Sequence, residues 1–238
     1  MHPQIVQEAI LANDNRKTIY EFLARTYATE ATVEYLQQFV KKKDLFRASA
    51  RDPEIHGTEL ADGFGQIADY ASSIEGADFD KVRVGLAVEY AGLFLGAWRL
   101  PHPSESVYVT EGQLLMQKPR DQVLKVYRDM GVDKVDQFTQ PEDHIALELQ
   151  FMAHLCDSTS LALKEGRLSD ATKYLDVQKG FLDEHLIKWV PKLAADIIKS
   201  ARAEFYKAIA KITEGYVEID KEVVAELAET LAVRLGSN

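Results

Sequence analysis

Apolar side chains recur at three- and four-residue intervals along nearly the whole chain. In "NRKTIYEFLARTYATEA", for example, Ile19, Phe22, Leu23 and Tyr27 line one face of a helix. No segment alternates apolar and polar residues as a half-buried strand would, and no internal repeat is visible. The sequence therefore predicts an all-α fold, a bundle of about nine or ten helices.

Turn-forming residues divide this helical pattern into two predicted subdomains. "KPRDQVLKVYRDMG" is a well-marked short helix, with Pro119 in its first turn and Gly131 after its end. The polar connector "VDKVDQFTQ" follows, and helical periodicity resumes at Pro141. We therefore expect an N-terminal helical subdomain over 1–131, a hinge at 132–140 and a C-terminal helical subdomain over 141–238.

Charge and hydropathy narrow the possible partners and locations. The chain has 238 residues with 38 acids and 28 bases, a net charge of −10. Such a surface repels nucleic acid and anionic lipid and favours basic peptides. The most apolar stretch, Val84 to Trp98, contains Glu89 and is shorter than the ~20 residues that span a bilayer. The start of the sequence lacks the pattern of a secretory signal, so we expect a cytoplasmic protein that is not inserted in a membrane.

The single cysteine, Cys156, excludes an internal disulfide and any site built from several cysteines. Its neighbours, "MAHLCDST", are typical of a buried helix face, where cysteine acts as a small apolar residue. We expect no bound metal and no cofactor.

The stretch "TQPEDHIALELQFM" places a proline, two acids and a histidine just before an apolar helical run. Pro141 suits an early helical position, and Glu142 and Asp143 in the first turn would oppose the helix dipole. The pattern predicts a helix that begins at Pro141, but it does not explain His144. Asp143 and His144 could instead act as an acid–base pair, or with Glu148 as part of a metal site. A small helical hydrolase or metal enzyme is therefore one alternative.

Two other stretches are unusual. The loop "WRLPHPSESVYVTEG" presents an aromatic and proline-rich rim with polar groups, which either wraps the end of a bundle or receives an amphipathic peptide. In "QKGFLDEHLIKWVPKL" the apolar residues recur at helical spacing, which is typical of a core helix with His185 as a satisfied polar contact. A helical adaptor for an unrelated partner would also fit these features.

Taken in order, "EYAGLFLG", "PSESVY", "PEDHIALELQFM" and "FLDEHLIKWVPKL" resemble the TorD/DmsD/NarJ family of chaperones for molybdenum enzymes. The motifs cover about residues 80 to 195. The resemblance implies an all-helical protein that catalyses no reaction and binds the N-terminal leader of a molybdoenzyme catalytic subunit, which is often a twin-arginine export signal. Binding would hold the apo-enzyme for cofactor insertion and delay its export. Molybdenum-cofactor biosynthesis proteins are further possible partners, and the chain would be a monomer or a domain-swapped dimer.

The resemblance also implies a peptide-binding surface made by the proline loop and the Asp-His segment. Carried over to this sequence, the residues are Trp98, Pro101, Pro103, Ser106, Tyr108, Glu142, Asp143 and His144. The loop lacks the tryptophan that directly precedes the serine in some family members.

Overall fold

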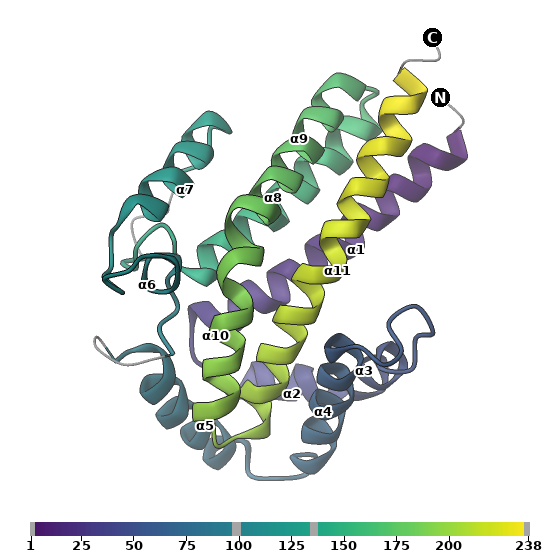
Figure 1. Cartoon of the computed structure of the whole chain (residues 1–238). Helices are drawn as coiled ribbons and strands as arrows, with labels where there is room; N and C mark the ends of the chain where they lie inside the picture. The colour runs from purple at the N-terminus through teal and green to yellow at the C-terminus, as the bar shows by residue number, and fades with distance from the viewer. Residues whose placement is uncertain (1–2, 97–100, 134–137, 236–238) are drawn as a thin grey trace. The chain divides into compact units, whose positions relative to one another are not determined.

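The computed structural model describes residues 3–96, 101–133 and 138–235. Within these ranges the backbone is helical throughout apart from its connections, and the bridge between Ser104 and His144 is isolated rather than part of a strand. The elements are α1 (Pro3–Ala28), α2 (Val33–Lys41), α3 (Lys43–Ser49), α4 (Glu59–Ser73), α5 (Phe79–Phe94), α6 (Glu105–Val109), α7 (Lys118–Asp129), α8 (Ile145–Lys164), α9 (Leu168–Phe181), the π-helical segment η1 (Leu182–Leu186), α10 (Ile187–Ser200) and α11 (Glu204–Leu235) (Figure 1). The predicted all-α fold is confirmed. Of the described helices, none is long and apolar enough to cross a membrane.

Side-chain caps and glycines set many of the helix ends. Thr32 accepts a hydrogen bond from the Tyr35 N–H at the start of α2, and Thr58 accepts one from Ala61 at the start of α4. Gly131 after α7 and Gly166 after α8 have φ values of 71° and 73°. Glycine adopts this left-handed conformation without a steric penalty, so each ends its helix. The predicted end of the helix "KPRDQVLKVYRDMG" before Gly131 is thus confirmed.

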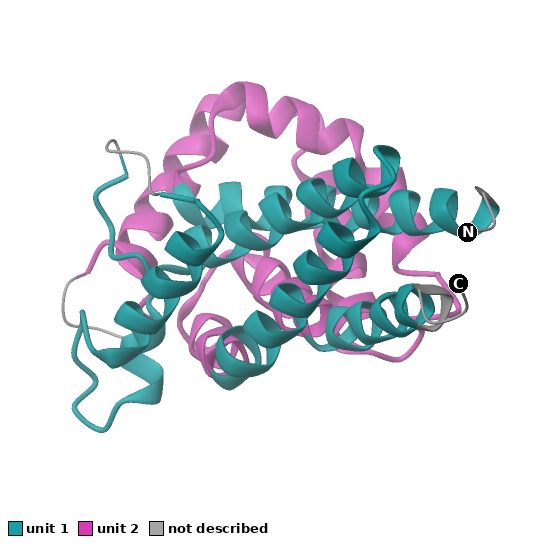
Figure 2. Ribbon diagram, turned by 90° about the horizontal axis from the view of Figure 1, so that it is seen from above, with its two compact units in different colours: residues 1–28, 104–188, 218–238 teal, residues 29–103, 189–217 magenta. Residues whose placement is uncertain are grey.

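The chain forms two compact units, each assembled from separate segments (Figure 2). Unit 1 contains residues 1–28, 104–188 and 218–238, and unit 2 contains 29–103 and 189–217. This grouping is a different division from the sequential one expected at 132–140. Residues 134–137 of that connector lie outside the described residues, so the hinge stays a prediction.

In unit 1, α8 packs along both α1 and α9. Ile145, Leu149, Met152 and Leu155 recur along α8 and are fully buried, as the helical spacing of the sequence requires. An aromatic group continues this core, with ring centroids 4.6 Å apart for Tyr127 and Phe151 and 5.0 Å apart for Phe151 and Phe181. The side chain of Phe181 thereby joins α9 to α7 and α8.

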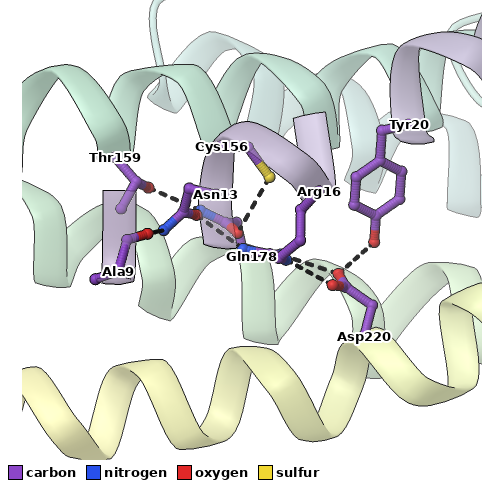
Figure 3. A network of polar contacts seen from close by, with 8 residues as sticks. All are labelled: Ala9, Asn13, Arg16, Tyr20, Cys156, Thr159, Gln178 and Asp220. Atoms are coloured by element: carbon purple, nitrogen blue, oxygen red, sulfur yellow. Dashed lines mark hydrogen bonds and ion pairs between the residues drawn. The ribbon is translucent and has the colours of Figure 1, made fainter. Parts of the chain in front are cut away.

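A buried polar network lies inside unit 1 (Figure 3). The Arg16 guanidinium donates from Nε and NH2 to the two carboxylate oxygens of Asp220, at 2.5 and 2.9 Å. Tyr20 donates its hydroxyl to the same carboxylate at 2.5 Å, and the NH1 group of Arg16 donates to Asn13. These contacts join α1 to the C-terminal half of α11. All of these side chains are buried, so removing either the Asp220 carboxylate or the Arg16 guanidinium would leave the other as an unpaired buried charge.

In unit 2, α4 approaches the first half of α11 very closely at two glycines. A Cβ atom at Gly215 would lie 2.6 Å from the backbone nitrogen of Leu60, and one at Gly63 would lie 2.8 Å from a side-chain carbon of Ile212. Both glycines are therefore required by the packing of these helices rather than by a turn. The aromatic core of the unit lies nearby, with the rings of Phe39 and Phe205 5.5 Å apart.

Gly215→Ala is expected to destabilise the protein by about 1–3 kcal/mol, because backbone on α4 would have to move. Gly65→Ala, on the same α4, is the matched control, since its Cβ would meet only the Cβ of Ala50 at 3.9 Å. That control should be neutral or more stable by up to ~1 kcal/mol, because alanine favours a helix over glycine. Urea denaturation of the three proteins checks the pair. Equal stability of the two variants would contradict the close approach.

Candidate functional site

Segment 104–109, which contains α6, is held by residues that lie far away in the sequence. The Asp143 carboxylate accepts hydrogen bonds from the Ser106 backbone N–H at 2.8 Å and from the Ser106 hydroxyl at 2.5 Å. The Asp143 carbonyl accepts from the Glu105 N–H at 2.9 Å. Ser104 and His144 complete this contact through the isolated antiparallel bridge. The "PSES" and "PEDH" motifs therefore face each other in the structure.

The third motif joins the same cluster from the π-helical segment. His185 on η1 places its Nδ1 atom 2.9 Å from a carboxylate oxygen of Glu105, and both side chains are buried. The imidazole also packs on the ring of Phe181, with centroids 4.8 Å apart. The expectation of His185 as a satisfied polar contact is confirmed. α6 is therefore fixed by Asp143 through Ser106 and by His185 through Glu105.

His144 is the N-cap of α8, not a residue of its second turn. Its backbone is extended, and its Nδ1 atom accepts a hydrogen bond from the Ala146 N–H at 3.1 Å. A nitrogen that accepts a hydrogen bond carries no proton, so this imidazole is neutral with its proton on Nε2. The helix predicted to begin at Pro141 begins instead at Ile145. The prediction was wrong because Asp143 accepts hydrogen bonds from Ser106 and Glu105 with its carboxylate and its carbonyl. Residues 141–144 form a turn, in which the His144 N–H donates to the Pro141 carbonyl at 3.1 Å, and His144 itself is extended.

Glu142 forms the more accessible edge of the cluster. Its carboxylate accepts a hydrogen bond from the Arg120 Nε at 2.5 Å, and the two side chains are 12% and 26% exposed. The hydrogen bond to Glu142 raises the pKa of the Arg120 guanidinium above its ordinary value. Tyr127 donates its hydroxyl to the Glu142 carbonyl at 3.3 Å, so α7 is tied to the same segment twice.

Burial dominates the electrostatics of the cluster. It raises the pKa of the Asp143 carboxyl, although the hydrogen bonds from Ser106 act in the opposite direction. Burial also raises the pKa of the Tyr127 phenol, and the carboxylates of Glu148 and Asp143 raise it further. The tyrosine therefore stays protonated and serves as a hydrogen-bond donor.

The predicted peptide-binding residues divide between the two units. Ser106, Asp143 and His144 come together as described, with Glu142 beside them, and Tyr108 is partly exposed on α6. Pro101 and Pro103 are buried and belong to unit 2. Trp98 lies outside the described residues. Whether these residues bind a peptide stays a prediction.

The three residues of the alternative hydrolase or metal site have structural roles or are buried. Asp143 accepts from Ser106, His144 caps α8, and Glu148 is fully buried on the same helix. In the described part of the chain, no three His, Cys, Asp or Glu side chains are grouped so as to hold a metal ion. Cys156 is buried beside Gln178, with its pKa raised to about 12 by burial, so its thiol is not a reactive nucleophile.

Sequence reasoning missed the connection from α6 to α7. Leu114, Leu115 and Met116 are consecutive and exposed, with exposed fractions of 53%, 37% and 61%. Met116 and Gln113 have positive φ values, a conformation that costs free energy for residues other than glycine. The Gln117 N–H donates to the Ser106 hydroxyl at 3.2 Å. Ser106 therefore contacts both this loop and Asp143. The signal in the sequence was an apolar triplet with no helical periodicity between Gly112 and Pro119.

Sequence similarity to known proteins extends over nearly the full length of this chain. A chaperone protein TorD from Vibrio cholerae serotype O1 is 27% identical over 230 residues, covering 94% of this chain and 99% of that protein. A chaperone protein TorD from Aliivibrio fischeri is 24% identical over 223 residues, covering 92% and 99%. The expectation of a protein that catalyses no reaction agrees with relatives that are chaperones.

A solved structure from Archaeoglobus fulgidus, described as that of a candidate redox enzyme maturation protein, aligns with a TM-score of 0.47. It is 18% identical and the alignment covers 85% of this chain and 93% of that one.

A family-level comparison covers the motifs directly. The model of the family "Nitrate reductase delta subunit" matches residues 57–195, more than half of the chain. This range contains α6, the Asp143–His144 segment and His185, which are the parts that the structure joins by buried hydrogen bonds. The chain therefore belongs to the nitrate reductase delta subunit family, the family of the TorD and NarJ chaperones.

Proposed function

We propose that this chain is a cytoplasmic, system-specific chaperone for the catalytic subunit of a molybdoenzyme. Its contact with the client is the N-terminal leader of that subunit, either a twin-arginine export signal or a remnant of one that is not exported. Holding the leader keeps the subunit available for insertion of its molybdenum cofactor and delays export. Near full-length similarity to two TorD chaperones supports this assignment.

The observation that carries the proposal is the convergence of three motifs on α6. Ser106 is bonded to Asp143, and Glu105 is bonded to His185, so two segments remote in sequence fix one short helix. Buried polar contacts of this kind cost free energy unless all partners are present, so they hold the segment in one conformation. A pre-formed site reduces the entropy lost when a flexible peptide binds.

The residues implied by the family resemblance then take two roles in the proposed site. Asp143, His144 and Ser106 are buried and position the segment. Tyr108 is partly exposed and the Glu142 side chain is 12% exposed, so we assign contacts with the leader to these two residues. The family resemblance adds Trp98, Pro101 and Pro103 of the proline loop to the proposed contacts. Arg120 already shows how a guanidinium meets Glu142, and a leader arginine would compete for the same carboxylate.

The affinity should be moderate. A leader peptide is disordered before it binds, and ordering it offsets part of the contact free energy. We expect a Kd on the order of micromolar or somewhat tighter. The chaperone acts as a monomer or as a domain-swapped dimer, and molybdenum-cofactor biosynthesis proteins are its second class of partner.

The test is a tagged capture from the native host grown anaerobically, with bound proteins identified by mass spectrometry. We expect a molybdoenzyme catalytic subunit, and we expect deletion of its leader to abolish capture. Capture that survives deletion would move the contact to the mature subunit. Recovery of no molybdoenzyme from cells that express one would overturn the proposal and favour an adaptor for an unrelated partner.

A further inference from the structure

A groove with a volume of about 510 Å³ lies within unit 1, between α7 and the continuous run of α9 and η1. Val126 on α7 and Met130, the C-cap residue directly after it, contribute apolar surface on one side. Val177 and Phe181 contribute it from α9. Gln122, Val126 and Met130 recur at four-residue intervals, so a single face of α7 lines the groove. An apolar slot between two helices is the shape that receives a third, amphipathic helix.

Gly180 leaves its part of the groove lining open. It lies on α9, is exposed, and a Cβ atom built on it would meet nothing within 4 Å. Glycine is unfavourable in the middle of a helix by about 1 kcal/mol relative to alanine, so packing within the chain does not explain it. A glycine at this position lets another backbone approach α9 closely. Met130 opposite is a flexible side chain that adapts to apolar partners of different shape.

The rims of the groove carry acids in weak ion pairs. Asp129 is paired with Lys125 at 2.8 Å, and Glu184 with Lys188 at 2.5 Å, each within one turn of its own helix. All four side chains are largely exposed. Exposed pairs of this kind contribute about 0–1 kcal/mol, so an incoming guanidinium can replace the lysine. The ion pair that arginine forms is stronger than the lysine pair it replaces, because arginine can bind both carboxylate oxygens at once.

The groove adjoins the cluster around α6 through one shared residue. His185 lines it and at the same time holds the Glu105 carboxylate. His185 also lies in η1, and single π-helical turns inside α-helices occur frequently at functional sites. A helix bound in the groove would therefore rest against the residue that fixes α6.

We infer that this groove binds the apolar segment of the client leader as a short helix, with one leader arginine at Asp129 or Glu184 and another at Glu142. The inference rests on the proposed function and places the leader on a surface that the predicted residues do not include. From Gln122 to Met130 the wall is about 12 Å long at 1.5 Å per residue. That length matches roughly eight helical residues, within the range of about 7–15 apolar residues in export signals.

The test blocks the groove without disturbing the fold. Gly180→Leu adds a side chain into open space and improves helix propensity, so its melting temperature should equal or exceed that of the unmodified protein. The matched control is Ala195→Leu on α10, an exposed helical position that does not line the groove. The probe is a fluorescent synthetic copy of the leader of the captured subunit, followed by anisotropy.

We expect Gly180→Leu to weaken binding at least tenfold and Ala195→Leu to leave it unchanged. Asp129→Asn combined with Glu184→Gln should weaken the natural probe severalfold, but not a probe whose arginines are replaced by glutamine. Unchanged binding by Gly180→Leu, or loss only in Ala195→Leu, would overturn the groove assignment and leave the chaperone function standing. A leader that does not bind the unmodified protein would overturn the proposed function, and the groove assignment with it.

Discussion

The Asp220→Ala variant is expected to lose about 3–5 kcal/mol of folding free energy, the cost of breaking a buried ion pair by removing one partner. Burial alone would lower the pKa of Arg16, but the attraction of Asp220 outweighs it and the pKa is raised well above its ordinary value. Without the carboxylate, the guanidinium of Arg16, a residue that is only 4% exposed, loses its counter-charge. Tyr20 loses its hydrogen-bond acceptor in the same substitution. Urea denaturation at neutral pH measures the loss.

A double variant separates the ion pair from the packing around it. Arg16→Met combined with Asp220→Leu removes both charges and keeps apolar volume, and such replacements are often neutral or stabilising. We expect the double variant to be more stable than Asp220→Ala by at least ~2 kcal/mol. An Asp220→Ala loss below ~1 kcal/mol would show that Arg16 reaches solvent or another acid, contrary to the network in Figure 3.

Little of this polar network could be predicted from the sequence. Asn13, Arg16 and Tyr20 follow one another at helical spacing, but 200 residues separate Tyr20 from its acceptor Asp220. Helical periodicity identifies which face of a helix is buried, and it does not identify which helix covers that face. The all-α fold was predictable because it depends on local periodicity and local punctuation such as Gly131. The pairing of polar side chains was not, because it depends on tertiary contacts.

The site shows the same limit in more detail. The family was readable from four short motifs, and the match over residues 57–195 confirms it. The helix start was misplaced by four residues because Pro141, Glu142 and Asp143 have the composition of a first helical turn. The hydrogen bond that the Ser106 N–H donates to Asp143 keeps these residues out of the helix, which begins at Ile145. The sequence analysis missed Arg120, the exposed triplet that begins at Leu114, and the open position at Gly180. The role of each depends on residues that are near it in space but not in sequence.

The Asp143→Ala variant should both destabilise the protein and weaken leader binding, because the Asp143 carboxylate is one of the two side-chain groups that fix α6. The Ser106 N–H and hydroxyl would lose their shared acceptor, and a hydrogen bond to a charged group is worth about 1.5–3 kcal/mol. Removing a buried carboxylate also relieves its own desolvation, so we expect a net loss of about 3 kcal/mol. Leader binding should fall at least tenfold under conditions where the variant is still folded. Circular dichroism and anisotropy on the same samples measure both effects, and normal binding by the folded variant would remove Asp143 from the site.

Asp143→Asn is the conservative partner of that variant and adds a pH signature. The asparagine oxygen can accept from Ser106 as the carboxylate does, so most of the stability and the binding should be retained. Burial raises the pKa of Asp143 in the folded protein above its ordinary value of 3.8, so the folded state holds this proton more tightly than the unfolded state. The stability of the unmodified protein relative to Asp143→Asn should therefore fall as the pH rises above 3.8, until the folded-state carboxyl is ionised. Below 3.8 the carboxyl is protonated in both states, and the difference becomes independent of pH. A relative stability that rose over this interval would mean that the hydrogen bonds from Ser106 outweigh burial, and that Asp143 is held as a stabilised anion.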